Sequence, residues 1–459
     1  MSAHRRRSTA GPLELYGFPP SAPDWGAGWR DGYLRAAVSA GGRKVHYDSG
    51  NTAWVLASAA LVLFMTPGLS LFYGGMVRSK NVLAMLMQNF GVMAVVSLVW
   101  VWVTYSLAFG PDWGGAGLIG TLHFAGLGHL HQAVPGYSGA RAQTIPPVAF
   151  IIFQMMFAII TPALLTGSSA DRMKFGTFLV FIVAWSVLVY APIAHWVFSP
   201  DGWLARQGTE DFAGGTVVEL NAGMAGAALA LVAGARRGWP RTLMRPHNIP
   251  LTVLGGGILW FGWFGFNAGS ALSASRAGVA FINTNTAMAA ALLGWIAVEK
   301  RRTGKPTTLG AVSGAIAGAV AVTPACAFVN TLGATVIGIV AGVVAAFAVS
   351  LKFRLGLDDS LDVLAIHGVS GLLGTLLLGL FATATALGRN GLLYGGGAGL
   401  LGHQALAVAS VGVYSFAMTA SIACVIRRTL GLRVGADDET AGLDLSLHEE
   451  TAYDFEASS

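Results

Sequence analysis

The sequence predicts an all-α integral membrane protein that crosses the bilayer eleven times. Charged residues make up 11% of the chain, whereas an ordinary soluble domain carries about 25%. Hydrophobic residues make up 54%, and they gather in runs of about 20 residues, the length that an α-helix needs to cross a hydrocarbon core. The 62 glycines suit the close helix packing that membranes favour. A soluble globular class is therefore excluded.

The eleven apolar runs follow one another through most of the chain, separated by short polar connections. They lie near 53–75, 81–107, 146–167, 175–199, 213–234, 249–271, 277–298, 308–328, 332–351, 361–386 and 402–426. Each run is read as one helix, because backbone groups in lipid must be hydrogen-bonded within their own segment.

The basic residues between these runs predict the orientation. If the first run starts outside, 17 Lys and Arg lie in the inner loops and the tail, and four lie in the outer loops. The excess of positive charge on the cytoplasmic side then predicts an outer N-terminus and an inner C-terminus. We expect a multi-pass protein of the cytoplasmic membrane. Its net charge of +6 reflects topology and does not indicate a nucleic-acid partner.

Two polar segments flank the apolar region. Residues 1–51 are predicted to form an extracytoplasmic extension, which lacks the apolar core of a signal peptide. Residues 52–426 are predicted to form the transmembrane domain, and residues 427–459 a cytoplasmic tail, with seven acidic residues between Asp437 and Asp454. We expect no enzyme and no cofactor, because the chain shows no phosphate-binding loop, no nucleophile next to a base and no metal-ligand pattern.

Glu219 and His367 are ionisable residues within apolar runs, where a charge is costly and usually functional. Each is followed by glycines at the same two offsets, four and seven residues later, which lie on one face of an α-helix. Two matching helices that each carry a proton-exchanging group predict a duplicated transport path.

Other pairs of motifs support a duplication. Asp211 lies eight residues before Glu219, and Asp359 lies eight before His367. Two more pairs match in the same order: Phe72-Tyr-Gly-Gly with Phe266-Asn-Ala-Gly, and Thr161-Pro-Ala with Thr323-Pro-Ala. They pair runs one to five with runs six to ten, and leave a final helix unpaired. Since five is odd, the two halves must be inverted repeats.

The repeat also predicts where the ionisable pair lies. Asp211 and Asp359 are expected to cap their helices from opposite faces of the membrane. Eight residues of helix place Glu219 and His367 about 12 Å deep, so both side chains should meet near the midplane.

Several motifs together resemble the ammonium transporter (Amt/Mep) family over residues 52–455. The matching stretches are Phe72-Tyr-Gly-Gly-Met-Val-Arg-Ser-Lys-Asn, Asp211-Phe-Ala-Gly-Gly-Thr-Val-Val-Glu-Leu-Asn-Ala-Gly, Gly262-Trp-Phe-Gly-Phe-Asn-Ala-Gly-Ser, Thr323-Pro-Ala-Cys, Ile366-His-Gly-Val, Gly431-Leu-Arg-Val and Gly442-Leu-Asp. The resemblance implies a homotrimer with one hydrophobic pore in each subunit. It also implies a possible regulatory partner of the PII type at the cytoplasmic face.

The resemblance assigns roles to residues by position. It implies that Phe157 and Phe266 form a phenyl gate. Phe153, Phe157, Phe198 and Ser270 then belong to an external ammonium site, where a hydroxyl and aromatic faces hold the cation. Asp211 and Asp359 are structural and electrostatic, while Trp263 and His367 line the pore. On the residues alone, Ser270 could instead bond a backbone carbonyl.

Two positions depart from the family pattern. Phe198 stands where the external site usually has Trp; a phenyl ring is a weaker cation partner than indole, and Trp196 or Trp203 is a candidate replacement. Glu219 stands where the pore usually has its first histidine, as in some fungal members. We expect Glu219 and His367 to share one proton.

The expected function is transport of ammonium, and of methylammonium, with deprotonation and proton relay at Glu219 and His367. Two alternatives stay open: an ammonium sensor with little flux, and a cation-leaky variant channel. A potassium-type filter sequence is absent from the chain. His123, His129 and His131 could hold a metal by chance, but a solvated loop is the preferred interpretation, and we expect no metal site.

Overall fold

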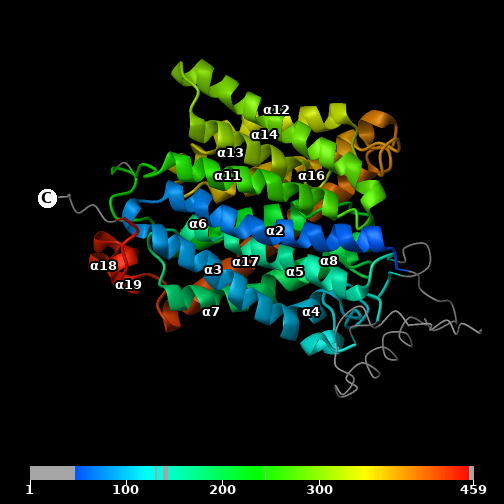
Figure 1. Ribbon diagram of the computed structural model, residues 1–459, viewed down its shortest axis with the longest axis horizontal. Helices are drawn as coiled ribbons and strands as arrows, with labels where there is room; N and C mark the ends of the chain where they lie inside the picture. The colour runs from blue at the N-terminus through cyan, green and yellow to red at the C-terminus, as the bar shows by residue number, and fades with distance from the viewer. Residues whose placement is uncertain (1–46, 130–131, 138–142, 243, 454–459) are drawn as a thin grey trace, which may run out of the picture. The chain divides into compact units, whose positions relative to one another are not determined.

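The computed structural model describes residues 47–129, 132–137, 143–242 and 244–453, and within these ranges the chain is helical, without a β-strand (Figure 1). The chain divides into Met1–His46 and Tyr47–Ser459, so nearly all of the predicted extension 1–51 lies outside the described residues. The first helix begins at Ser49, slightly earlier than predicted, because the Asp48 carboxylate accepts a hydrogen bond from the Asn51 N–H at 2.6 Å.

The helices follow the predicted runs in order. Their bounds are α2 (Ser49–Met76), α3 (Val82–Val99), α4 (Tyr105–Phe109), α5 (Pro147–Leu164), α6 (Thr166–Ser169), α7 (Phe175–Trp185), α8 (Ala191–Phe198), α9 (Trp203–Gln207), α10 (Asn221–Ala233), α11 (Ile249–Trp263), α12 (Ala277–Thr303), α13 (Thr308–Val322), α14 (Thr331–Ala348), α15 (Leu351–Leu355), α16 (Ser370–Phe381), α17 (Gly399–Thr429), α18 (Ala436–Ala441) and α19 (Leu443–His448). Short π-helical segments extend several of them: η3 (Trp100–Thr104), η6 (Ser186–Tyr190), η7 (Gly215–Leu220), η8 (Phe264–Ala268) and η10 (Leu364–Val369).

Ten helical stretches within the described residues are long and apolar enough to cross a membrane. The predicted eighth span is shorter than expected: α13 has 15 residues and ends at Val322. Pro324, two residues later, has no N–H with which to continue the helix, and its carbonyl instead accepts a hydrogen bond from the Phe212 N–H at 3.1 Å. Ten full-length spans and one shorter apolar helix therefore stand where eleven spans were predicted.

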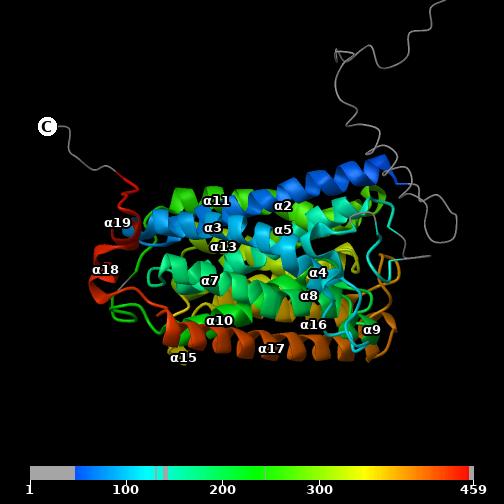
Figure 2. The same ribbon diagram turned by 90° about the horizontal axis from the view of Figure 1, so that it is seen from below.

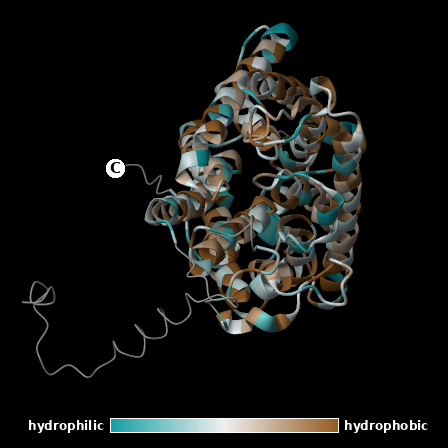
Figure 3. Cartoon of the chain, turned by 90° about the vertical axis from the view of Figure 1, so that its right-hand side faces the viewer, coloured by the Kyte–Doolittle hydropathy of each residue, from teal (hydrophilic) through white to brown (hydrophobic). Residues whose placement is uncertain are grey.

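Hydrophobic side chains cover the outward faces of the helices. Figure 3 shows brown, hydrophobic segments around the bundle when it is viewed from one end. Leu98, Trp102, Leu293 and Val413 are each more than 60% exposed. Large apolar residues so exposed would be unfavourable in water, whereas lipid tails solvate them. The exposed apolar surface therefore supports a membrane setting.

Glycines bring the Glu219 and His367 segments together at the centre of the bundle. A Cβ atom on Gly223 would lie 2.1 Å from the Cα of Gly368, and one on Gly371 would lie 2.9 Å from the nitrogen of Leu220. The two backbones can approach this closely only because the side chain is missing at both positions. The expectation of one regular α-helical face needs a correction, since Glu219 and His367 lie on the π-helical segments η7 and η10.

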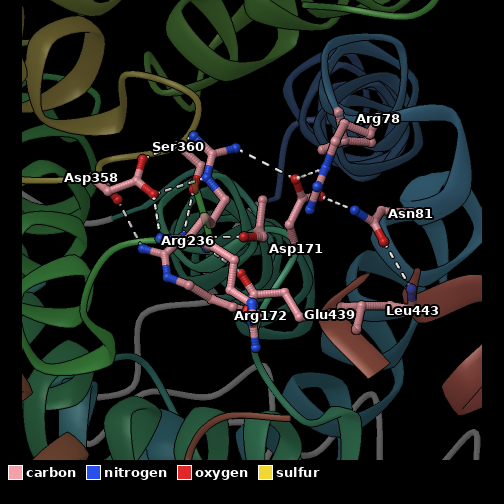
Figure 4. A network of polar contacts seen from close by, with 12 residues as sticks. Arg78, Asn81, Asp171, Arg172, Arg236, Asp358, Ser360, Glu439 and Leu443 are labelled. Carbon is pink, nitrogen blue, oxygen red and sulfur yellow. Dashed lines mark hydrogen bonds and ion pairs between the residues drawn. The ribbon is translucent and has the colours of Figure 1, made fainter. Parts of the chain in front are cut away.

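The C-terminal tail folds back against one end of the bundle (Figures 1 and 2). Figure 4 shows the polar network there, with Asp171 between Arg78 and Arg236. The Asp171 carboxylate contacts the Arg78 guanidinium at 3.0 Å, and the amide oxygen of Asn81 accepts from the Leu443 N–H of α19 at 2.8 Å. The tail helices are therefore held by specific hydrogen bonds to the ends of the first helices.

Candidate functional site: an occluded path through the bundle

An open cavity of about 430 Å³ lies at the end of the bundle opposite the tail helices. Its wall includes every residue predicted for the external site: Phe153, Phe157, Phe198 and Ser270. They come from α5, from the end of α8 and from the residues that follow η8, so three separate parts of the chain build one cavity. We call this cavity the vestibule.

Two phenyl rings close the floor of the vestibule. The rings of Phe157 and Phe266 lie 4.4 Å apart between centroids, at 33°, and both side chains are buried. Phe153 packs edge-on against Phe157 at 5.0 Å, and Phe198 does the same at 6.3 Å. Phe153 and Phe157 are one helical turn apart on α5, while Phe266 projects from the π-helical segment η8. The predicted gate pair is thus in contact.

The hydroxyl group of Ser270 already makes one hydrogen bond to the backbone. Its Oγ donates to the Phe266 carbonyl at 2.8 Å, the backbone bond that serine often makes in membrane helices. This bond leaves the lone pairs of the oxygen free to accept hydrogen bonds from a cation in the vestibule. The backbone bond and a substrate role are therefore compatible.

Asp211 caps the start of η7, as predicted. Its Oδ1 accepts from the N–H groups of Gly214 and Gly215 at 2.8 and 2.7 Å, and its Oδ2 accepts from the N–H of Thr216 at 2.8 Å. The Thr216 hydroxyl also donates to Oδ2, at 2.5 Å. These donors balance the negative charge of Asp211. The same hydrogen bonds hold the loop that leads into η7 in place.

Asp359 holds the segment that carries His367 in a similar way. Its Oδ2 accepts from the Leu364 N–H at 2.7 Å, five residues along, just as Asp211 accepts from Thr216. Its Oδ1 accepts from the Ser168 hydroxyl at 2.9 Å, which ties η10 to α6. The two aspartates therefore fix the two π-helical segments by the same local geometry.

A narrow chamber lies beyond the Phe157 and Phe266 rings. Its wall contains apolar side chains from α2, α5, α11 and α13, together with Phe266, Trp263, Glu219 and His367. The chamber has a volume of about 10 Å³, which is room for a single water-sized molecule. The Trp263 indole N–H donates to the Thr323 hydroxyl at 3.0 Å, and this bond holds the ring in the wall.

Glu219 and His367 meet in this chamber. The Nδ1 of His367 lies 2.7 Å from the Oε2 of Glu219, a hydrogen-bond distance, and both side chains are almost fully buried. The predicted convergence of the pair is thus present in the structure. With its hydrogen on Nδ1, the imidazole would keep a lone pair on Nε2.

Sequence reasoning missed part of this site. Trp196 and Trp203 do not line the vestibule; they pack against each other at 5.9 Å, and the Trp196 N–H donates to the Leu118 carbonyl. Tyr137 and Glu210 do line it. Only the position of Glu210 beside Asp211 could have signalled its role. Among the residues that the structure describes, no group of three or more metal-ligating side chains is present.

An open vestibule, two phenyl rings in contact and a buried Glu–His pair, all within a bundle of apolar helices, are typical of a membrane transport protein for a small solute. The chain belongs to the ammonium transporter family, whose model matches residues 53–453. It is 50% identical over 439 residues to an ammonium transporter of Mycobacterium tuberculosis (strain ATCC 25618 / H37Rv), covering 90% of this chain and 92% of the relative. It is 48% identical over 408 residues to the ammonium transporter of Bacillus subtilis (strain 168), covering 88% and 98%.

Solved structures agree with this assignment. The crystal structure of Saccharomyces cerevisiae Mep2 matches with a TM-score of 0.79 at 36% identity, covering 85% of this chain and 89% of Mep2. A structure described as a sensor Amt protein also matches, with a TM-score of 0.79 at 30% identity, covering 87% and 98%. The fold is therefore shared with proteins described both as Mep2 and as a sensor.

Proposed function

We propose that this protein moves ammonium across the cytoplasmic membrane by deprotonating it at the Glu219 and His367 pair. The observation that carries the proposal is the 2.7 Å contact between these two side chains in an apolar chamber, below the phenyl gate. A permanently charged ion is costly in such a chamber, whereas neutral ammonia is not. The geometry thus favours a path in which ammonia and its proton separate.

The proposed cycle conserves every proton. Ammonium enters the vestibule, where the Ser270 oxygen and the phenyl faces replace part of its water shell. The rings of Phe157 and Phe266 rotate to admit it. One N–H bond then breaks, the proton binds to the Nε2 of His367, and the adjacent Glu219 carboxylate balances the new charge. Ammonia moves inward, the pair releases its proton to the same side, and one ammonium has crossed in two parts.

This cycle explains discrimination against potassium, which is similar in charge but has no proton to give. Glu219 modifies this discrimination, because a carboxylate attracts any cation more strongly than a neutral imidazole does. We expect electrogenic ammonium uptake with faster turnover, looser rejection of potassium and a different pH profile from a protein with histidine at this position. Methylammonium, which also carries N–H bonds, is expected to follow the same path.

The test compares the parent protein with Glu219→His in liposomes on a solid-supported membrane. The parent should give the larger ammonium current, and the variant should reject potassium more strictly at a shifted pH optimum. Glu219→Gln serves as the matched control, since it keeps the shape of the side chain but cannot carry a proton. Equal selectivity and pH dependence in the parent and Glu219→His would overturn the role of Glu219.

The same experiment separates transport from sensing. A sensor with little flux would bind ammonium without a sustained current in the parent protein, and a leaky channel would pass potassium as readily as ammonium. A current that saturates with ammonium and depends on Glu219 would contradict both alternatives.

We also propose that the two halves of the chain are inverted repeats, with the N-terminus outside and the tail in the cytoplasm. The reciprocal glycine packing supports this arrangement, because Gly223 meets the residue after His367 and Gly371 meets the residue after Glu219. The matching aspartate caps of η7 and η10 support it as well. We expect this subunit to form a homotrimer and the inner face to bind a regulatory protein of the PII type. Native mass spectrometry of the purified protein tests both.

A further inference from the structure

Two carboxylates, Glu210 and Asp211, lie side by side in the wall of the vestibule. The two carboxylates differ in how far nearby hydrogen-bond donors balance their negative charge. Asp211 is surrounded by the backbone N–H groups that it caps, on Gly214, Gly215 and Thr216. A helix start carries partial positive charge, so the charge of Asp211 is balanced locally and contributes little to the field in the vestibule.

Glu210 has no such backbone partners for its carboxylate. One oxygen, Oε1, lies 3.1 Å from the Nε of Arg389. The other oxygen, Oε2, is buried and has no hydrogen-bond partner within the described part of the chain. A buried carboxylate oxygen without a donor is unfavourable, so the negative charge of Glu210 is not balanced locally as that of Asp211 is. Glu210 is thus the carboxylate of the vestibule with unused acceptor capacity.

The backbone at Glu210 is held rigidly. Its N–H donates to the amide oxygen of Gln404 at 2.9 Å, and its carbonyl accepts from the Gln404 amide nitrogen at 2.7 Å. Gln404 is fully buried on α17, so α17 fixes the loop that carries Glu210. The position of the carboxylate does not depend on Arg389 alone.

Arg389 is a partial partner. Its side chain is 48% exposed, whereas that of Glu210 is 21% exposed, and its guanidinium also donates to the Gly208 carbonyl. An ion pair with one half-exposed member is weak, so it reduces the negative potential at Glu210 without cancelling it. The aromatic part of the vestibule wall is mainly phenyl rings, which attract cations less strongly than indole does.

We propose that Glu210 draws ammonium into the vestibule by its charge, and that Arg389 sets how strongly it does so. Glu210 then acts before the gate and raises the local concentration of cations, while Ser270 and the phenyl rings hold the cation that arrives. This inference rests on the proposed function, because it assigns a further specificity-determining residue to the same outer site.

The experiment measures ammonium current against ammonium concentration in proteoliposomes at low ionic strength. Glu210→Gln should raise the half-saturating concentration by about two- to fivefold, as expected for one partly screened charge near the site, with an unchanged maximal current. Arg389→Gln should lower the half-saturating concentration by a similar factor, because the carboxylate loses its positive neighbour. Both differences should shrink at high salt, where charges are screened.

The opposite directions of the two variants distinguish attraction from a structural role. If the pair merely clamps the loop, both variants would raise the half-saturating concentration, and that result would overturn the inference. Asp437→Asn removes an exposed charge from α18 at the other end of the bundle and should leave the concentration dependence unchanged. An equal effect of this control would overturn the inference as well. Absence of any ammonium current in the parent would instead contradict the proposed function itself.

Discussion

The chemistry of the Glu219 side chain depends on both its burial and its hydrogen-bonding partner. Alone in an apolar chamber, its carboxylate would be strongly disfavoured. At 2.7 Å from the Nδ1 of His367, it has a hydrogen-bonding partner, and the proposed proton relay rests on this pair. Composition could reveal that Glu219 is unusual, but only its position next to His367 makes it useful.

Asp362 is a second acidic residue with an unusual environment, at the end of the bundle that carries the tail. Its carboxylate pairs with the Lys352 ammonium at 2.8 Å. Burial raises the pKa of Asp362 to about 6 from an ordinary value of 3.8; the nearby Lys352 ammonium acts in the opposite direction. Asp362 also has a positive φ of 63°, a conformation that Asn tolerates well, so Asp362→Asn changes the charge without straining the backbone.

The raised pKa predicts a pH dependence of stability. Since the folded protein binds this proton more tightly than the unfolded chain, the contribution of Asp362 to stability is complete below about pH 4 and is lost as the pH rises through about 6. The melting temperature of the parent minus that of Asp362→Asn should therefore fall between pH 4 and pH 7. Thermal unfolding in detergent at a series of pH values measures it, and a difference that rises with pH would contradict the prediction.

At the scale of elements, glycines decide how closely the helices approach each other, because they carry no side chain. The segments that carry Glu219 and His367 cross at Gly223 and Gly368 with no space for a methyl group. The π-helical segments η7, η8 and η10 carry Glu219, Phe266 and His367, and such wider turns occur often at functional sites. The repeat and the eight-residue offset from each aspartate predicted that Glu219 and His367 converge, whereas the π-helical geometry has no comparable signal in the sequence.

Two glycine substitutions test the packing at this crossing. Gly223→Ala should destabilise the protein severely and abolish transport, because the new Cβ would lie 2.1 Å from backbone atoms of Gly368. Gly257→Ala is the matched control: it is also within a helix, but its Cβ would meet nothing within 4 Å. Alanine has the higher helix propensity by about 1 kcal/mol, so the control should be stable and active. Melting temperature and ammonium current measure both variants, and equal tolerance would refute close crossing.

At the scale of the whole molecule, charge and apolar surface act together. The described helices expose large hydrophobic side chains outward, while the network around Asp171 gathers arginines at the end where the tail helices dock (Figure 4). Basic residues that remain on the cytoplasmic side orient a membrane protein. The end with the tail is therefore expected to face the cytoplasm, and the vestibule to face outward.

Cysteine labelling tests this orientation. Arg276→Cys and Asn390→Cys lie on the vestibule side and should react in intact cells with a maleimide that cannot cross membranes. Arg301→Cys and Glu449→Cys lie on the tail side and should react only after the cells are opened. Cys326 is buried and Cys424 is half-buried, so the parent protein supplies the background. The reverse pattern of labelling would contradict the proposed topology.

Some features of this protein could be predicted from its sequence, and others could not, for physical reasons. Composition and the lengths of the apolar runs determined the class, because a helix that crosses lipid needs about 20 consecutive apolar residues. Charge in an apolar run and repeated glycines are visible in one dimension, and they singled out Glu219 and His367. Phe157, Phe266 and Ser270 were singled out by the resemblance to the ammonium transporter family. The shortened eighth helix was not foreseen, because the apolar run continues past Pro324 while the helix does not.

Only the tertiary structure decided how these residues meet. It brought the rings of Phe157 and Phe266 into contact, joined Glu219 to His367, and packed Trp196 and Trp203 against each other outside the vestibule wall. It also distinguished Glu210 from Asp211. The two residues are adjacent in sequence, but backbone N–H groups balance the charge of Asp211, whereas one carboxylate oxygen of Glu210 has no donor within the described residues. Distances between segments far apart in the chain depend on packing in three dimensions, which local spacing does not contain.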